Sequence, residues 1–282
     1  MTELPAPGIY SNVSFAAYQK WPAVNQSSLK LLKQTPARAR WVMENPSDPS
    51  DEVVIGNAAH CLILEPDDFN LRYLKNIEGD GRRTDIKFAR AEIRETAEKY
   101  GLTVLSHDDF FLVHSWAEAV LKTDKASQLL RESTKELSAI WLDSATKQTC
   151  KARLDAWAEQ SGVVIDVKTC ADASPAAFAR SIWNFGYHNQ AAFYRTALRA
   201  LGFSPEHHVF ICIEKSAPYC VAVYRLDDAI INAGELENQE LLRLWATCAR
   251  DNNWPGYPDK VVDIAVPGYA IRELEERYGS LT

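Results

Sequence analysis

Residues 151–169 read KARLDAWAEQSGVVIDVKT, and this stretch predicts a β-hairpin around which the rest of the chain is organised. Arg153–Trp157 alternates apolar and polar residues, which is typical of a strand with one buried face. Ser161 and Gly162 supply the turn, and Val163–Thr169 forms a second strand rich in β-branched residues. The stretch therefore predicts two neighbouring antiparallel strands of one sheet.

Three charged side chains of this hairpin can meet on one face. Asp166 and Lys168 are two residues apart and project from the same face, which Asp155 can approach if the register allows. Burial of two carboxylates and an ammonium costs free energy unless another group compensates for it. A divalent cation between the carboxylates would do so, with the lysine near a substrate's negative charge. The alternative is an ordinary solvated hairpin in which Lys168 is a surface ion-pair partner, because short patterns also occur by chance.

Length and composition describe an ordinary soluble chain. Its 282 residues suit one large domain or one domain with an appended lobe, and 46% apolar residues can bury a real core. The net charge of −7 argues against indiscriminate adhesion to nucleic acid but is compatible with a local basic channel. The start, MTELPAPGIY, lacks the features of a signal peptide, and no apolar run is long enough to span a membrane. We therefore expect a cytoplasmic protein without membrane contact.

The six cysteines are scattered through the chain. They stand at positions 61, 150, 170, 212, 220 and 248, without a C-x-x-C pair. The ligand spacing of zinc and iron–sulfur sites is absent, and a disulfide framework is not expected in this context. The sequence therefore predicts no iron–sulfur cluster.

The order of predicted elements indicates an α/β fold with a mixed central sheet flanked by helices. We expect a single domain over residues 1–282, in which residues 1–130 are mainly helical, residues 131–250 form the α/β core and residues 251–282 form a tail. Residues 66–85 should be irregular.

Two predicted helices bring further polar side chains toward the hairpin. The helix over residues 51–65 contains His60, and the helix over residues 187–201 carries Gln190 and Tyr194 four residues apart, on one face. A lone histidine on such a helix is most often a satisfied core residue. The face with Gln190 and Tyr194 can equally well pack on the sheet.

Taken in chain order, these residues resemble the motif series of the PD-(D/E)XK nucleases. The series reads Gly56…His60, Asp155, Asp166-Val167-Lys168 and Gln190-x-x-x-Tyr194. It is most similar to the RecB-like branch, and within it to the exonuclease VIII (RecE) C-terminal nuclease domain, which the phrases KARLDAW and VVIDVKT resemble best. The opening Ser27–Lys30 followed by Thr35–Ala37 is similar as well. One departure is Leu154, which replaces the nominal proline before Asp155.

The resemblance implies a restriction-endonuclease-like core with a divalent-metal site. Asp155 and Asp166 would be magnesium ligands, with the Val167 carbonyl and His60 as further ligands. Lys168 would orient or activate the attacking water and stabilise charge on the phosphate. Hard oxygen ligands suit Mg²⁺, and the histidine would make Mn²⁺ a competent substitute.

Further site residues follow from the same resemblance and from charge. Gln190 and Tyr194 would position the metal-site groups or the scissile phosphate, and Glu136 is an additional candidate for the site. Because phosphate binding needs cations, the candidates for DNA contacts are Arg38, Arg40, Arg82 and Arg83.

The resemblance implies a metal-dependent deoxyribonuclease that hydrolyses linear double-stranded DNA from its ends. It further implies 5′-to-3′ polarity, a role in phage or prophage recombination beside a single-strand annealing protein, and a ring of four subunits. The alternative is a nuclease-like fold that binds nucleic acid or protein without cutting, although no member of the metal-lysine set is replaced here. A cluster-bearing nuclease of the Cas4 or AddB kind would need four suitably spaced cysteines, which are missing.

Apolar surface for subunit contacts could come from two long helices and the tail. We expect these helices at Asp108–Leu130, with Asp108 or Asp109 near its cap, and at Asp227–Arg250. The tail, with Trp254–Pro258, should wrap over the surface. These faces could instead simply cover the sheet, and the residue spacing does not distinguish the two.

Overall fold

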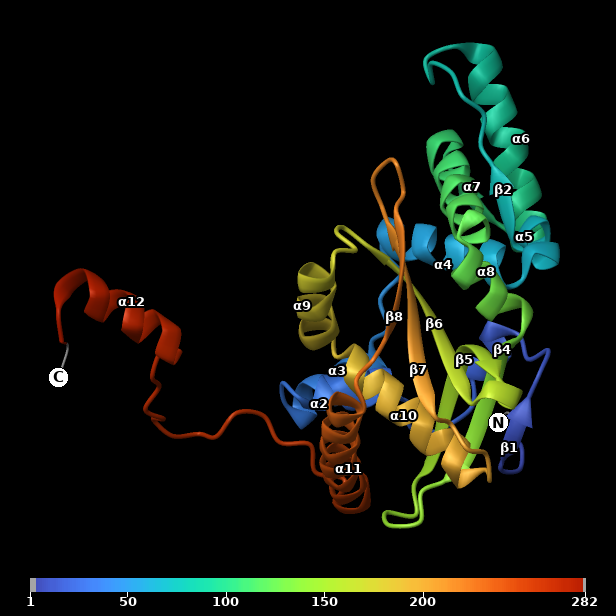
Figure 1. The fold of residues 1–282 in the computed structure, drawn as a ribbon. Coiled ribbons are helices and arrows are strands. Elements are labelled where there is room, and N and C mark those ends of the chain that lie inside the picture. Colours follow the sequence, from blue (N-terminus) through green and yellow to red (C-terminus); the bar gives the residue numbers. More distant parts are fainter. Residues whose placement is uncertain (1–3, 281–282) are drawn as a thin grey trace.

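A mixed sheet forms the centre of the computed structural model, which describes residues 4–280 (Figure 1). Within that range, six strands lie in the order β1 (Gly8–Tyr10), β4 (Thr134–Leu142), β5 (Thr149–Ala158), β6 (Val163–Cys170), β7 (His207–Glu214) and β8 (Val221–Arg225). β6 and β7 run parallel, and the other neighbouring pairs are antiparallel. Helices cover both faces, so the predicted mixed α/β fold is confirmed.

The predicted hairpin is present as β5 and β6. Its turn is longer than predicted, because a 3₁₀ turn at Glu159–Ser161 precedes Gly162. Gly162 has a φ of +63°, and a Cβ there would approach the Ser204 carbonyl oxygen to 3.0 Å, so this position requires glycine. The two strands pair only where Ala156–Ala158 faces Val163–Ile165, and they part beyond that point.

Helices pack on the sheet in two layers. One face is covered by α4 (Asp51–Leu64), α7 (His107–Lys122) and α8 (Asp124–Arg131). The other face is covered by α2 (Gln26–Leu32), α3 (Pro36–Glu44), α9 (Pro175–Phe185), α10 (Tyr187–Ala200) and α11 (Asp228–Asp251). The two helices that carry predicted site residues, α4 and α10, therefore lie on opposite sides of the sheet.

The N-terminal segment folds over β4 and β5 and is held there by a buried lysine. The segment contains α1 (Phe15–Gln19). The Lys151 ammonium donates to the main-chain carbonyls of Tyr18 and Gln19 at 3.0 Å and of Trp21 at 2.8 Å. It also lies 4.8 Å from the centroid of the Tyr18 ring. A positive charge from the sheet thus stabilises the C-terminal end of α1.

The lobe beside the sheet is more regular than predicted. Residues 66–85 contain α5 (Pro66–Arg72) and β2 (Tyr73–Lys75), so the prediction of an irregular segment is wrong there. β2 pairs in parallel with β3 (Thr103–Leu105), which follows α6 (Thr84–Tyr100). Because the partner strand lies on the far side of a helix in the sequence, no local pattern reveals the pair.

The predicted helix Asp108–Leu130 is wrong as a single helix. α7 and α8 meet at Thr123, whose ψ of 105° interrupts the helical backbone. Asp108 and Asp109 lie near the cap of α7, as predicted, in its first turn, and the N-cap itself is Ser106. The Ser106 hydroxyl accepts a hydrogen bond from the Asp109 N–H at 3.0 Å, which satisfies one of the free donors at the helix start.

The tail leaves the body of the molecule, and its last helix, α12 (Gly268–Tyr278), stands apart (Figure 1). Trp254 packs beside α11, as the prediction of a wrapping tail requires. The Pro255 carbonyl accepts from the Ala37 N–H at 3.1 Å and is the last such main-chain link from the described tail to the body. Beyond it the prediction is wrong, and Ile264 is 95% exposed.

Two further predictions concern the whole chain. Over residues 4–280, no helix is both long enough and apolar enough to pass through a lipid bilayer. The assignment of residues 1–282 to one domain stays a prediction, and residues 1–3 and 281–282 fall outside the described part.

Candidate active site

A cleft of about 1000 Å³ opens beside the point where β5 and β6 part. Its walls come from α1, α2, α4 and α5, from β4, β5 and β6, from the lobe at Tyr73, Gly101 and Thr103, and from the first half of α10. Six residues named as candidates for the site line it, namely His60, Glu136, Asp155, Lys168, Gln190 and Tyr194. Asp166 is fully buried and pairs with Lys168. Motifs that are far apart in the sequence therefore meet at one place.

At Asp155, strand β5 loses its regular alternation, and its apolar side chains switch from one face of the sheet to the other. Leu154 packs in the core with α2 and α10, whereas Ala156 packs in the core with α4 and α7. Regular alternation would place both on one face. Glu136 of β4 stands opposite Asp155, has a φ of +52° and makes no regular pair with it. Beyond the end of the β5–β6 ladder, the Asp155 carboxylate accepts a hydrogen bond from the Val167 N–H at 2.8 Å.

Asp166 and Lys168 project from the same face of β6, as predicted, and form an ion pair. Among the described residues, the buried Oδ1 atom of Asp166 has no hydrogen-bond donor. Burial raises the pKa of Asp166 to about 6, although the Lys168 ammonium acts in the opposite direction. For Lys168, burial acts to lower the pKa, but the carboxylates of Asp166 and Asp155 raise it above its ordinary value. The site thus holds a charged lysine paired with a buried carboxylate whose Oδ1 atom has no donor among the described residues.

His60 of α4 approaches the same carboxylates from the other layer. Its Nδ1 atom lies 3.5 Å from Asp155 Oδ2. Burial, with the charge of Lys168 as a second cause, lowers the pKa of His60 to about 4. The imidazole is therefore neutral near pH 7, as a metal-binding histidine must be. Gly56, one turn earlier, also lines the cleft and has open space where a Cβ would stand.

Gln190 and Tyr194 share one face of α10, as predicted. Gln190 Nε2 donates to the Tyr194 hydroxyl at 2.8 Å. Burial raises the pKa of Tyr194 well above its ordinary value, and the charges of Asp166 and Asp155 act in the same direction. The phenol therefore stays protonated and can donate a hydrogen bond to a carboxylate or phosphate oxygen.

Glu136 brings a further carboxylate to the cleft. It forms an ion pair with Arg153, whose guanidinium also donates to the Val13 carbonyl at 2.6 Å. Burial, followed by the charge of Asp155, raises the pKa of Glu136 to about 7. A left-handed backbone costs a residue of this kind roughly 1–3 kcal/mol, and such strained residues tend to cluster at active sites. These observations place Glu136 within the candidate site.

Residues 25–264 match a family described as PDDEXK-like domain of unknown function (DUF3799). The chain belongs to this family. The crystal structure of a "Putative exonuclease" from Eubacterium rectale shares the PDDEXK-like fold, with a TM-score of 0.56 and 10% identity over 96% of this chain and 100% of that one. A phage related exonuclease from Haemophilus somnus 129PT has a TM-score of 0.34 and 10% identity over 82% of this chain and 96% of that one. No curated protein matches the chain. The predicted PD-(D/E)XK core is thereby confirmed.

The donors at this PDDEXK-like site suit a hard divalent cation. Asp155 and Asp166 offer carboxylate oxygens, and the Asp166 Oδ1 atom lacks a donor among the described residues. In the described part of the chain, no three His, Cys, Asp or Glu side chains converge closely enough to enclose a metal ion. Mg²⁺ needs no such cage, since one or two carboxylates usually hold it while water and substrate phosphate complete its shell. His60 and the Val167 carbonyl stay predicted as further ligands.

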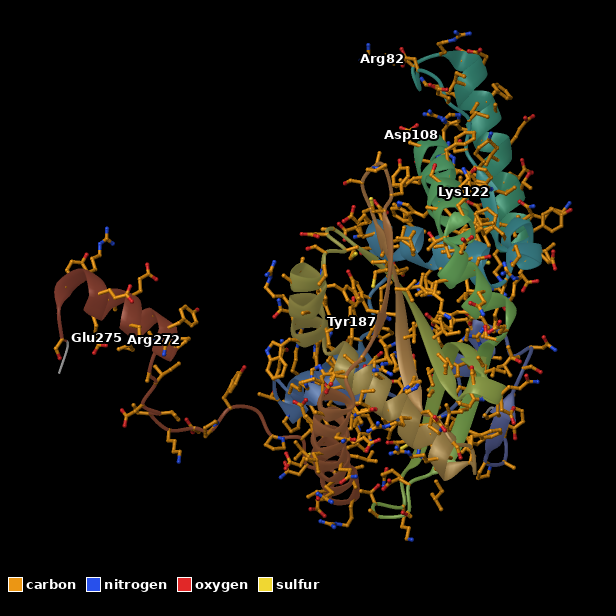
Figure 2. All side chains as sticks on the ribbon, in the orientation of Figure 1. Arg82, Asp108, Lys122, Tyr187, Arg272 and Glu275 are labelled. Atoms are coloured by element: carbon orange, nitrogen blue, oxygen red, sulfur yellow. The ribbon has the colours of Figure 1, made fainter. Side chains whose placement is uncertain are left out.

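Tyr187 contacts the PDDEXK-like site and was not predicted. It is the first residue of α10, and Figure 2 shows it where α9 passes into α10 beside the sheet. The centroid of its ring lies 4.8 Å from Lys168 Nζ. A sequence signal does exist, because Tyr187 precedes Gln190 by three residues and so shares its helix face.

The four arginines predicted as phosphate contacts lie outside the cleft. Arg82 and Arg83 stand at the far end of the lobe, where Figure 2 labels Arg82. Arg38 and Arg40 belong to α3, and Arg40 forms an ion pair with Glu44 on the same helix. Their contact with DNA stays a prediction.

Proposed function

We propose that the protein is a Mg²⁺-dependent deoxyribonuclease that hydrolyses the phosphodiester bonds of linear double-stranded DNA from its ends. The observation that carries this proposal is the convergence of Asp155, Asp166 and Lys168 at a cleft of a PDDEXK-like fold. Hydrolysis of a phosphodiester requires a polarised phosphoryl oxygen, an activated water and a stabilised leaving oxygen.

The groups around the cleft can meet these requirements. A divalent cation, when bound, supplies the polarisation and lowers the pKa of a bound water. Asp155 and Asp166 would hold that cation, with His60 and the Val167 carbonyl as further ligands. The Lys168 ammonium reaches the cleft with 14% of its side chain exposed and stabilises negative charge on the phosphate.

The hydrogen-bonded pair of Gln190 and Tyr194 positions the reacting groups from the opposite wall. Because Gln190 is held by the Tyr194 hydroxyl, its amide keeps a defined direction toward the cleft. The pair therefore restricts where a substrate phosphate can lie relative to the carboxylates.

The finer parts of the proposal rest on the resemblance to the RecE nuclease. They are 5′-to-3′ polarity, a recombination role in phage or prophage beside a single-strand annealing protein, a ring of subunits and a cytoplasmic location. Mn²⁺ should replace Mg²⁺, because His60 is an acceptable ligand for it. The predicted phosphate contacts from Arg38, Arg40, Arg82 and Arg83 belong to the same proposal.

Digestion of end-labelled DNA tests the proposal. We expect progressive degradation of linear duplex in Mg²⁺ or Mn²⁺, no cutting of covalently closed circles, and no activity in excess EDTA. Equal cutting of circles and linear duplex would refute action from the ends, and full activity in EDTA would refute the metal requirement. The Asp166→Ala protein, purified in parallel, controls for contaminating nucleases. Binding of duplex without any cleavage would favour a non-cleaving binding module instead.

A further inference from the structure

We propose that Tyr187 is a positioning residue that fixes the Lys168 ammonium for the reaction through the face of its aromatic ring. The Lys168 Nζ atom lies 4.8 Å from the ring centroid, and both residues line the cleft. The inference rests on the proposed function, in which Lys168 stabilises charge on the scissile phosphate.

Lys168 needs such a contact because of its chemistry. A lysine ammonium is a compact charge on a flexible stem, with no fixed fork of donors to set its direction. Among the described residues, this ammonium makes an ion pair with the Asp166 carboxylate and a cation–π contact with the Tyr187 ring. When Asp166 shares its carboxylate with a cation, the attraction between the ammonium and the ring quadrupole persists. The ring is therefore the contact that keeps Lys168 in place during the reaction.

Tyr187 is itself held firmly enough to act as a guide. The centroid of its ring lies 5.6 Å from the ring centroid of Phe185, 6.0 Å from that of Phe210 and 6.2 Å from that of Phe178. Phe210 stands on β7 directly beside Asp166 of β6. The aromatic cluster thus fixes the ring relative to the same strand pair that carries the Asp166–Lys168 ion pair.

The simpler role for Tyr187 is to fill space at the start of α10. The two roles differ in what they require of the side chain. Filling space needs apolar volume, whereas attraction of an ammonium needs the negative face of an aromatic ring. The hydrogen bonds within the described residues include none to the Tyr187 phenol oxygen, so the hydroxyl is dispensable under either role.

Substitution at position 187 separates the two roles. Tyr187→Phe should keep kcat within about two-fold of the wild type, since the ring face remains. Tyr187→Leu should lower kcat for linear duplex about 2- to 30-fold, the rate equivalent of about 0.5–2 kcal/mol of cation–π attraction. KM should stay close to the wild-type value. An equal loss in both variants, or no loss in either, would overturn the proposal.

Fluorinated phenylalanines at position 187 decide the matter even if the leucine variant folds poorly. Each added fluorine weakens the negative face of the ring at nearly constant size, so log kcat should fall stepwise from phenylalanine to the trifluoro form. A flat series would show a merely structural role and refute the proposal. Trp183→Leu is the matched control, because Trp183 is an exposed aromatic residue of α9 that lies outside the cleft and should leave kcat unchanged.

A readout independent of cleavage keeps this proposal distinct from the proposed function. In lysine-labelled protein without DNA, the ε-methylene signal of Lys168 should carry a ring-current shift that Tyr187→Leu removes. If that shift is present and the wild type cuts no DNA, the nuclease proposal fails while the contact stands. If the wild type cuts DNA and neither the shift nor kcat responds at position 187, the positioning role is refuted alone.

Discussion

Substitution of Lys151 by methionine tests whether the sheet holds the N-terminal wall of the cleft. Methionine keeps the length of the side chain but removes its three hydrogen bonds to the carbonyls of Tyr18, Gln19 and Trp21. Hydrogen bonds from a charged donor contribute about 2 kcal/mol each, or about 6 kcal/mol together. Burial lowers the pKa of Lys151 from 10.5 to about 8, which means that burying its charge costs about 3 kcal/mol. Methionine avoids this cost, so about 3 kcal/mol of the lost stability is regained. We expect a net loss of about 3 kcal/mol in the free energy of unfolding and a midpoint lower by roughly 6–12 °C.

Urea and thermal unfolding followed by circular dichroism measure this loss. Lys20→Met is the matched control, because Lys20 is an exposed lysine of the same segment and its loss should change the free energy of unfolding by no more than about 0.5 kcal/mol.

The folded-state pKa of Lys151 lies below that of the unfolded chain, so the unfolded chain binds more protons between pH 8 and 10.5. The stability of the wild type relative to Lys151→Met should therefore rise with pH across that range. A change below about 1 kcal/mol at pH 7 would refute the reasoning.

Four further predictions concern the site and the assembly. Asp166→Ala should abolish cleavage while the thermal midpoint holds or rises slightly, because the repulsion between two close carboxylates is relieved; an unfolded variant would mean that Asp166 is structural. Lys168→Ala should still bind Mg²⁺ in calorimetry but lose its turnover, and wild-type turnover would contradict the role of Lys168. Glu136→Gln should lower kcat about ten-fold at unchanged KM, and an unchanged kcat in steady-state assays would exclude Glu136 from the site. Light scattering at micromolar concentration should give the mass of a ring, whereas a mass near 31.7 kDa would mean a monomer.

Local patterns predicted the parts of the site that depend on local geometry. The two-residue period of a strand placed Asp166 beside Lys168, and the four-residue spacing of a helix placed Gln190 beside Tyr194. The resemblance to a known motif series, matched in order along the chain, predicted that these separate motifs meet at one site. Glu136 was named as a candidate, but its left-handed backbone opposite Asp155 could not be predicted with the same means, because it depends on an irregularity between two paired strands.

Two other features escaped prediction for the same physical reason. The pairing of β2 with β3 joins strands on either side of α6, and the contact of Tyr187 with Lys168 joins a helix start to a strand. Each contact depends on how distant segments pack: the strand pair leaves no local pattern, and the i, i+3 spacing of Tyr187 and Gln190 gives their shared helix face but not the contact with Lys168. Thr123 interrupts a stretch whose helical pattern runs on without a visible stop, so one predicted helix became α7 and α8.

The bonds that hold the N-terminal segment also limit when the molecule can be completed during its synthesis. Lys151 reaches the Tyr18 carbonyl across 133 residues of sequence, and Arg153 reaches the Val13 carbonyl across 140. At a translation rate of about 5–20 residues per second, the first segment waits roughly 7–27 s for its partner strand to be made. One wall of the cleft therefore closes only after β5 has left the ribosome, and until then a nascent chain has no finished cleft in which to hold a nucleic acid.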